Sequence, residues 1–226
     1  MIESWSEAMR TMASDIRSVQ GQSGTPARAL QADARQADEV LEPESIDAVI
    51  TSPPYPNEKD YTRTTRLESV ILGLVRDRRE LRELKQSLVR SNTRGVYKAD
   101  TDDQEVADHP VIGNIAERIE QRRIELGKTS GFERLYPRVT QLYFGGMARH
   151  LDNLRPALRP GAKLAYVVGD QASYLRVLIR TGQILSDLAQ SLGYRVSGID
   201  LFRTRPSTVT GDLLREEVVL LEWPGN

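Results

Sequence analysis

The sequence contains no cysteine and only two histidines, His109 and His150. The absence of cysteine excludes disulfides, thiolate metal sites and every mechanism that needs a cysteine nucleophile. Two histidines are too few for a histidine-rich metal site, so we expect no bound metal. Any chemistry of this chain must therefore use hydroxyl groups, carboxylates, amides, cations and the backbone.

The chain also lacks an excess of either charge and lacks long apolar runs. It has 31 Lys and Arg against 32 Asp and Glu, so the net charge neither favours nor excludes nucleic acid. No apolar run approaches the ~20 residues that cross a bilayer. The first ten residues carry Glu3, Trp5 and Glu7, unlike a signal peptide. We expect a cytoplasmic protein without a membrane partner.

Apolar periodicity predicts alternating helices and strands. The predicted helices are Ser4–Val19, Thr65–Val89, Val111–Leu126, Phe132–Leu158 and Val177–Leu192, and the predicted strands are Ala29–Ala32, Ile46–Ser52, Lys163–Val168, Tyr194–Phe202 and Glu217–Trp223. The polar stretch Asn92–Pro110 is expected to be an exposed loop. This order predicts an α/β fold with a mostly parallel sheet, in which the last two strands form an antiparallel hairpin.

The stretch DAVITSPPYPN, Asp47–Asn57, leads a β-branched strand directly into two prolines and a tyrosine. In open α/β sheets the ligand binds outside the carboxyl ends of the strands, where Ser52–Tyr55 is expected to lie. Proline fixes its own φ and keeps the preceding residue extended, so the carbonyls here point in defined directions. A carbonyl that no neighbouring amide uses is available to a ligand.

A hydroxyl group, a fixed carbonyl and an aromatic ring within four residues match an exocyclic amine on a planar base. The Ser52 hydroxyl oxygen and the Pro53 carbonyl can accept the two amine hydrogens, while the Tyr55 ring stacks on the base. Such a grip pulls the nitrogen toward tetrahedral geometry and directs its lone pair away from the protein. Attack on an activated methyl group then needs no covalent enzyme intermediate.

The motif TSPPY, Thr51–Tyr55, resembles the signature of the amino-methyltransferases that use S-adenosyl-L-methionine to methylate exocyclic nitrogens in DNA. That signature is Asp, Asn or Ser followed by Pro-Pro and an aromatic residue. Its Ser form is typical of cytosine N4 enzymes and also occurs in some adenine N6 enzymes. The stretches 32–50 and 158–170 resemble the family's segments before and after the motif.

The resemblance implies a Rossmann-like methyltransferase sheet, S-adenosyl-L-methionine as cofactor, and double-stranded DNA with a flipped base as substrate. A restriction-modification setting is typical of this family. Methylation of cytosine at ring carbon five is excluded, because that reaction needs a cysteine thiolate. Cytosine N4 is therefore the expected target, with adenine N6 as an alternative.

Individual residues follow as candidates for each role. The candidate catalytic residues are Ser52, Pro53, Pro54 and Tyr55; the candidate cofactor-binding residues are Asp33, Ser52 and Asp170; the candidate DNA-binding residues are Arg63, Arg66, Arg94, Arg203 and Arg205. Alternatives stay open for several of them. Asp33 is equally suited to cap the following helix, and the arginine-containing loops are equally suited to solvation.

One feature of the family is missing, namely the glycine-rich Phe-x-Gly-x-Gly loop that approaches the methionine part of the cofactor. The adjacent Gly145 and Gly146 lie in a helical stretch, where a close packing contact explains them better. We therefore expect residues 1–226 to form a single partial methyltransferase domain without the first strand and the glycine loop. Residues 65–160 would be a helical insertion within it.

Several explanations for the missing loop remain open. A second polypeptide supplies the glycine-rich motif, or the chain is a truncated reading frame that has lost cofactor binding. In the second case the chain is a catalytically inactive or half-enzyme DNA-binding subunit. A methyltransferase acting on RNA or on protein glutamine is a third possibility, because related pockets accept other planar amines and amides.

Overall fold

We analysed a computed structural model of the chain, which describes residues 2–207 and 211–225 apart from 23, 25, 58 and 212. The chain divides into two units, Met1–Gln31 and Ala32–Asn226, and each is described by itself. Among the described residues, no helix is both long enough and apolar enough to cross a membrane.

The first unit is built on one helix, α1 (Ile2–Val19), followed by the short 3₁₀ helix η1 (Gln20–Gln22). The predicted helix Ser4–Val19 is therefore confirmed. No residue of α1 is buried, although apolar side chains recur along it at three- and four-residue steps. The result is an amphipathic helix whose apolar stripe is open to solvent.

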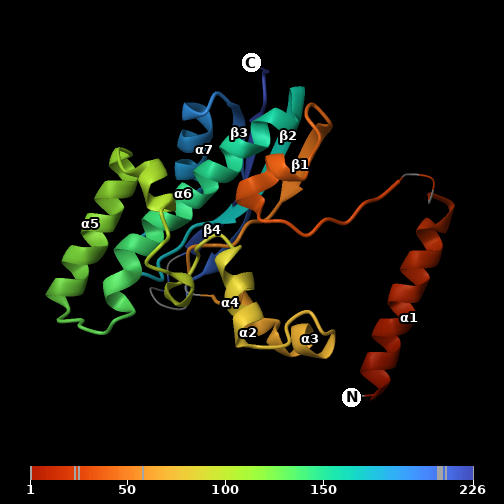
Figure 1. Cartoon of the computed structure of the whole chain (residues 1–226), viewed down its shortest axis with the longest axis horizontal. Helices are drawn as coiled ribbons and strands as arrows, with labels where there is room; N and C mark the ends of the chain where they lie inside the picture. The colour runs from red at the N-terminus through yellow and green to blue at the C-terminus, as the bar shows by residue number, and fades with distance from the viewer. Residues whose placement is uncertain are drawn as a thin grey trace. The chain divides into compact units, whose positions relative to one another are not determined.

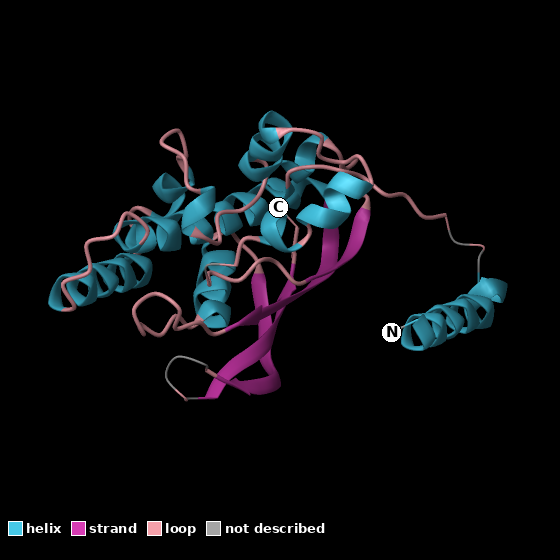
Figure 2. Ribbon diagram, turned by 90° about the horizontal axis from the view of Figure 1, so that it is seen from below, coloured by secondary structure: helices cyan, strands magenta, loops and turns pink. Residues whose placement is uncertain are grey.

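The second unit contains a four-stranded sheet of β1 (Ile46–Thr51), β2 (Leu158–Gly169), β3 (Arg195–Pro206) and β4 (Leu213–Glu222). The strand order is β1-β2-β4-β3, as Figures 1 and 2 show. Only β1 and β2 pair in parallel; β4 runs antiparallel to both β2 and β3. The predicted C-terminal hairpin is present, but the prediction of a mostly parallel sheet is wrong. The reason is that β4 turns back from β3 and inserts between β3 and β2.

The predicted strand Ala29–Ala32 is also wrong, because residues 26–33 have no regular structure. Asp33 ends this stretch as the N-cap of the 3₁₀ helix η2 (Ala34–Glu39). A strand needs a neighbour for its backbone hydrogen bonds, and none of the described strands pairs with this segment. The local pattern alone could not show that the partner is missing.

The chain between β1 and β2 is mainly helical. It contains α2 (Tyr61–Thr64), α3 (Arg66–Ile71), α4 (Arg78–Gln86), η3 (Thr93–Gly95), η4 (Asp102–Val106), α5 (Pro110–Glu125), η5 (Glu133–Leu135), α6 (Tyr136–Leu154) and η6 (Arg155–Ala157). The predicted helix Thr65–Val89 is interrupted between α3 and α4, where Gly73 adopts a positive φ of 70°. The predicted helices near α5 and α6 are confirmed with shifted ends.

Helices α6 and α7 (Thr181–Ser191) form one hydrophobic core with β2 and β4. Figure 2 shows the helices of this unit gathered on one side of the sheet. Fully buried members of the core include Tyr143, Phe144, Met147, Leu151, Leu164, Tyr166, Val168 and Val219. The opposite face of the sheet stays more open, and Ile50 on the edge strand β1 is 85% exposed.

Helix α6 packs unusually closely against η4 through Gly145 and Gly146. A Cβ atom on Gly145 would lie 1.7 Å from the carbonyl oxygen of Asp102, and one on Gly146 would lie 3.3 Å from the Asp102 carboxylate. This confirms the interpretation of the two glycines as a packing contact. It also overturns the prediction that Asn92–Pro110 is an exposed loop, since Asn92, Thr93 and Asp102 are buried.

We predict that Gly145→Ala lowers the free energy of unfolding by at least about 3 kcal/mol, because the new methyl group collides with backbone that cannot move independently. Urea unfolding followed by circular dichroism measures the loss. Gly113→Ala in α5 is the matched control, since a Cβ there meets nothing within 4 Å. The control should be neutral or stabilising by about 0.5–1 kcal/mol. Equal stability of both variants would contradict the packing argument.

Candidate functional site

The loop Ser52–Tyr55 leaves the sheet at the carboxyl end of the parallel β1–β2 pair. Thr51 is paired with Tyr166, so the next residue of each strand lies at the same level. The Ser52 hydroxyl group donates a hydrogen bond to the carbonyl oxygen of Val167 at 3.2 Å. This bond ties the start of the loop to the neighbouring strand, at the place where the sequence predicted a ligand.

The diproline leaves acceptors free for a ligand. In the described part of the chain, no group donates a hydrogen bond to the carbonyl oxygen of Pro53. Ser52 is exposed, and because its hydroxyl group acts as a donor to Val167, its oxygen keeps capacity to accept. Two acceptors on consecutive residues are thus available side by side.

The Tyr55 ring lies against Gly169, the last residue of β2. A Cβ atom on Gly169 would be 3.1 Å from Cε2 of Tyr55 and 3.3 Å from Cγ of Glu216. Burial raises the pKa of the half-buried Tyr55 phenol, while a hydrogen bond with Ser52 opposes the shift. The absence of a side chain on Gly169 therefore allows the ring to lie over the end of β2.

A cavity of about 140 Å³ lies beside the loop, on the side of Pro54. Its walls come from the loop, from the start of α2, and from the segment that follows α4. The lining residues are Pro54, Asp60, Tyr61, Thr62, Lys85, Leu88, Val89, Arg90, Ser91, Asn92 and Gly95. Sequence reasoning missed most of them, because the wall formed by residues 85–95 reaches the loop only through tertiary contacts.

Two hydrogen bonds hold this wall against the loop. The backbone amide of Asn57 donates to the Ser91 carbonyl oxygen at 3.2 Å, and the Asn92 side chain donates to the Lys59 carbonyl oxygen at 3.2 Å. The Lys85 ammonium group also pairs with the Asp60 carboxylate at 2.8 Å. Burial alone would raise the pKa of Asp60, but its hydrogen bond from Lys85 outweighs this and lowers it.

Asp170 directly follows Gly169 and is almost fully buried, with 1% of its surface exposed. Its Oδ2 atom accepts a hydrogen bond from Arg180 at 2.7 Å, whereas Oδ1 has no partner among the described residues. Burial raises the pKa of the nearby Glu217 carboxyl, and the charge of Asp170 raises it further. Of the predicted cofactor-binding residues, Ser52 and Asp170 thus lie at the ends of neighbouring strands.

Asp33, the third of these residues, has a different environment. It caps η2 by accepting a hydrogen bond from the Arg35 amide at 2.9 Å, and both of its oxygens accept from the Arg35 guanidinium at 3.0 and 2.6 Å. Burial raises the pKa of Asp33, but the hydrogen bonds from Arg35 more than compensate and lower it. The capping alternative is therefore the one that the structure displays.

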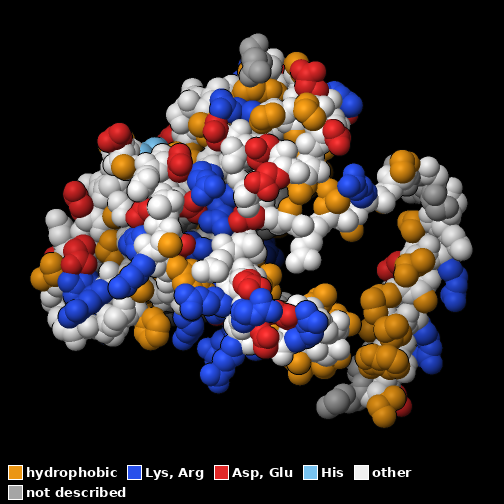
Figure 3. All heavy atoms as spheres, in the orientation of Figure 1, with side chains coloured by type: hydrophobic (Ala, Val, Ile, Leu, Met, Phe, Trp, Pro, Cys, Tyr) orange, Lys and Arg blue, Asp and Glu red, His pale blue; other side chains and the backbone are white. Residues whose placement is uncertain are grey.

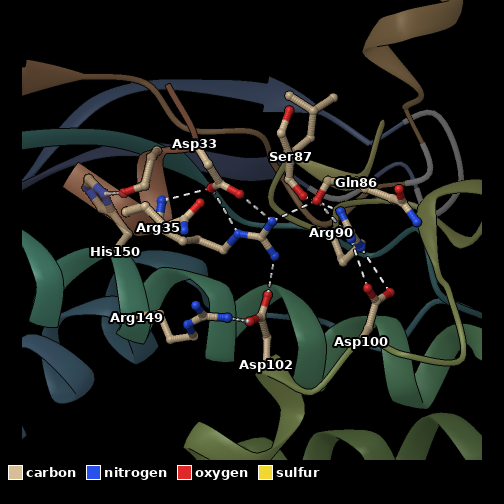
Figure 4. Close-up of polar contacts among 12 residues, drawn as sticks. Asp33, Arg35, Gln86, Ser87, Arg90, Asp100, Asp102, Arg149 and His150 are labelled. Carbon is tan, nitrogen blue, oxygen red and sulfur yellow. Dashed lines mark hydrogen bonds and ion pairs between the residues drawn. The ribbon is translucent and has the colours of Figure 1, made fainter. Parts of the chain in front are cut away.

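The Arg35 side chain is the centre of a buried charge network, shown in Figure 4. It lies between Asp33 and Asp102, with a distance of 2.6 Å to each carboxylate, and Arg149 binds the other oxygen of Asp102 at 2.6 Å. Arg35 also donates to the Gln86 carbonyl oxygen at the end of α4. Sequence reasoning missed this network, whose members Arg35 and Asp102 are 67 residues apart.

The five predicted DNA-binding arginines fall into two groups. Arg203 and Arg205 both form ion pairs with Glu216, so their charge is partly neutralised. Arg63, Arg66 and Arg94 are exposed and have no ion pair with a described residue. Arg94 lies over the Phe132 ring at 5.5 Å from its centroid. Figure 3 shows blue side chains gathered over the segment that contains α2 to α4.

The chain is similar in sequence to Type II methyltransferases. It is 30% identical over 163 residues to the methyltransferase M.AvaI of Nostoc sp. (strain PCC 7120), which covers 70% of this chain and 33% of the relative. It is 26% identical over 203 residues to M.BsoBI of Geobacillus stearothermophilus, covering 80% of this chain and 39% of the relative. The chain thus spans little more than a third of these curated relatives. No family model matches it.

Comparison with solved structures finds a DNA modification methylase of Thermus thermophilus. One of its structures aligns with a TM-score of 0.41 and 14% identity, over 86% of this chain and 52% of the methylase. Its complex with S-adenosyl-L-methionine aligns with a TM-score of 0.43 and 15% identity, over 86% of this chain and 54% of the methylase.

We predict that Gly169→Val lowers the free energy of unfolding by about 1–3 kcal/mol, because the new side chain displaces the Tyr55 ring. In a Tyr55→Ala background the same substitution should cost less than half as much, which a double-mutant cycle measured by urea unfolding reveals. Gly198→Val in β3 is the control, since a Cβ there comes no closer than 4.0 Å to another group. An equal cost in both backgrounds would show that Tyr55 does not lie on Gly169.

Proposed function

We propose that this chain is the base-binding part of a DNA methyltransferase that transfers a methyl group from S-adenosyl-L-methionine to the exocyclic amine of a flipped base. The observation that carries the proposal is the Ser52–Tyr55 loop at the carboxyl end of β1, with an unused Pro53 carbonyl and an aromatic ring beside it. The relatives of the chain, which are Type II methyltransferases, support it.

In the proposed reaction, the Ser52 hydroxyl oxygen and the Pro53 carbonyl oxygen accept the two amine hydrogens of the base. Pro54 keeps the loop rigid, and Tyr55 stacks on the base plane. The amine nitrogen then presents its lone pair and forms the new bond to carbon, while its surplus proton leaves to water. S-adenosyl-L-methionine supplies the methyl group on a sulfonium, whose sulfur retains the electron pair of the broken carbon–sulfur bond.

Cytosine N4 is the proposed target, with adenine N6 as the alternative. The serine form of the motif supports cytosine, and so does the cavity beside Pro54. Its volume of about 140 Å³ is close to that of an engineered cavity of about 150 Å³ that binds benzene, and therefore suits a single six-membered ring. The apolar side chains of Leu88 and Val89 provide walls suited to a planar ring.

The described residues fit only part of the cofactor. Ser52 and the unpartnered Oδ1 atom of Asp170 offer acceptors near the methyl group to be transferred. Asp33 does not fit a role at the adenine or ribose, because Arg35 occupies both of its oxygens. We infer that the remaining contacts come from residues outside this chain, on a second polypeptide. Residues 1–226 would then form a partial methyltransferase domain, with residues 65–160 as its helical insertion.

The occupation of Asp33 also supports a second candidate function, in which the chain is a half-enzyme or catalytically inactive subunit that binds DNA. In both cases we propose the phosphate backbone of DNA as the partner of Arg63, Arg66 and Arg94, whose guanidinium groups have no acidic neighbour among the described residues. Arg203 and Arg205 would contribute less, because Glu216 must first release them.

We predict that Pro53→Ala and Tyr55→Ala each abolish methylation by the assembled enzyme while the free energy of unfolding changes little. Pro53→Ala frees the carbonyl direction, and Tyr55→Ala removes the stacking surface. Transfer of radiolabelled methyl groups to DNA measures the effect, with the exposed Pro43→Ala as control. Full activity of either loop variant would contradict the site and favour the inactive-subunit alternative.

We predict that Arg63→Gln combined with Arg66→Gln weakens DNA binding by the assembled enzyme. The slope of log K against log salt concentration should become shallower by ~0.9 for each phosphate that no longer has an arginine beside it. Fluorescence anisotropy with duplex DNA over a salt series measures both quantities. Arg79→Gln is the control, because Arg79 is already paired with Glu83 at 2.9 Å. An unchanged salt slope in the double variant would exclude these arginines from the interface.

A further inference from the structure

Helix α1 carries an apolar stripe with a strict spacing. The six residues Ile2, Trp5, Met9, Met12, Ile16 and Val19 follow one another at alternating steps of three and four, and their exposed fractions range from 45% to 80%. No residue of α1 is buried. Figure 3 shows the orange side chains of this helix gathered on one of its faces.

This spacing indicates one partner helix rather than a broad protein surface. Helices that cover a globular core present a stripe at least 100° wide, with large apolar residues at three or four of every seven positions. In α1 the large apolar residues occupy only two of every seven, which is the seam of a two-stranded coiled coil. The positions that flank the seam hold the small residues Ser6, Ala8 and Ala13, which let a second helix approach closely.

The charges of α1 argue against a lipid surface as the partner. The helix carries the acids Glu3, Glu7 and Asp15 and the bases Arg10 and Arg17. Membrane-surface helices carry an excess of Lys and Arg on the polar face, which attracts anionic lipids. With more acids than bases, α1 has no such attraction.

We propose that α1 pairs with α1 of a second copy of this chain as a short antiparallel coiled coil. In this arrangement the layers along the seam are Ile2 with Val19, Trp5 with Ile16, and Met9 with Met12. The largest side chain, Trp5, then faces a β-branched one in both halves of the dimer. A parallel pair would instead place the two Trp5 rings in one layer.

Charge complementarity selects the same orientation. Glu3 lies in the first turn of α1 and Arg17 in the last. An antiparallel pair brings Glu3 of each helix to the end where Arg17 of the other lies, and it opposes the two helix dipoles. A parallel pair would bring Glu3 and Glu7 of the two copies together at one end. The antiparallel pair therefore has the more favourable electrostatics.

The expected strength follows from the length of the seam. Eighteen residues of helix span ~27 Å. Two such helices bury less than the 1,200–2,000 Å² of a standard stable interface, which is roughly the range for specific complexes. We therefore expect a reversible dimer that forms at micromolar concentrations of the full chain.

Sedimentation equilibrium of the full chain over a micromolar concentration series tests the proposal. The chain should shift from monomer to dimer, and the double variant Met9→Glu and Met12→Glu should stay monomeric. The control Thr11→Glu and Ser14→Glu adds the same charge to the polar face and should dimerise like the original chain. A monomeric original chain at every concentration, or dimerisation of the Met9→Glu and Met12→Glu variant, would overturn the proposal.

The absence of natural cysteine allows a second test that does not depend on the helix tolerating buried charge. Ile2→Cys and Val19→Cys chains are prepared separately and then mixed under mild oxidation. An antiparallel pair should give disulfide-linked dimers mainly in the mixture, because residues 2 of the two copies lie ~25 Å apart. Efficient disulfide formation within either separate sample, or none in the mixture, would overturn the antiparallel arrangement.

Discussion

The parallel pairing of β1 with β2 is the constraint on which the candidate site depends. It sets the end of β1 beside the end of β2, so that Ser52 reaches the Val167 carbonyl and the Tyr55 ring reaches Gly169. The two prolines then leave the chain no helical or strand-like continuation that could use their carbonyls. A one-residue shift of the register would turn Ser52 to the other face and separate these groups.

A second constraint, the buried network around Arg35, holds the segment that forms the far wall of the cavity. Arg35 joins η2, the end of α4 and η4 through Asp33, the Gln86 carbonyl and Asp102. Removing one member of such a network leaves a buried charge without compensation, which typically costs about 3–5 kcal/mol. The glycine pair in α6 belongs to the same arrangement, because it lets Asp102 approach. Asp33 therefore has a structural role that competes with binding a cofactor.

The division between predictable and unpredictable features follows the range of the interactions. The strand before the motif, the helices near α1, α5 and α7, and the packing role of Gly145 and Gly146 follow from residues close together in the chain. The direction of β4 depends on which strands it inserts between, which no local pattern specifies. The same limit applies to polar residues. Asn92–Pro110 looks like a solvated loop because its residues are polar, yet Asp102 is buried by Arg35 and Arg149 from distant segments. Within the candidate site, the loop Ser52–Tyr55 could be located from sequence, whereas its neighbour Gly169 required the fold.

The central claim is that the loop after β1 serves the methylation of an exocyclic amine. Mass spectrometry of nucleosides from genomic DNA tests it most directly, in host cells with the gene for this chain and in cells from which it has been deleted. The account predicts that N4-methylcytosine falls on deletion; a fall in N6-methyladenine instead would keep the amine chemistry and change the base. Unchanged amounts of both would contradict the account.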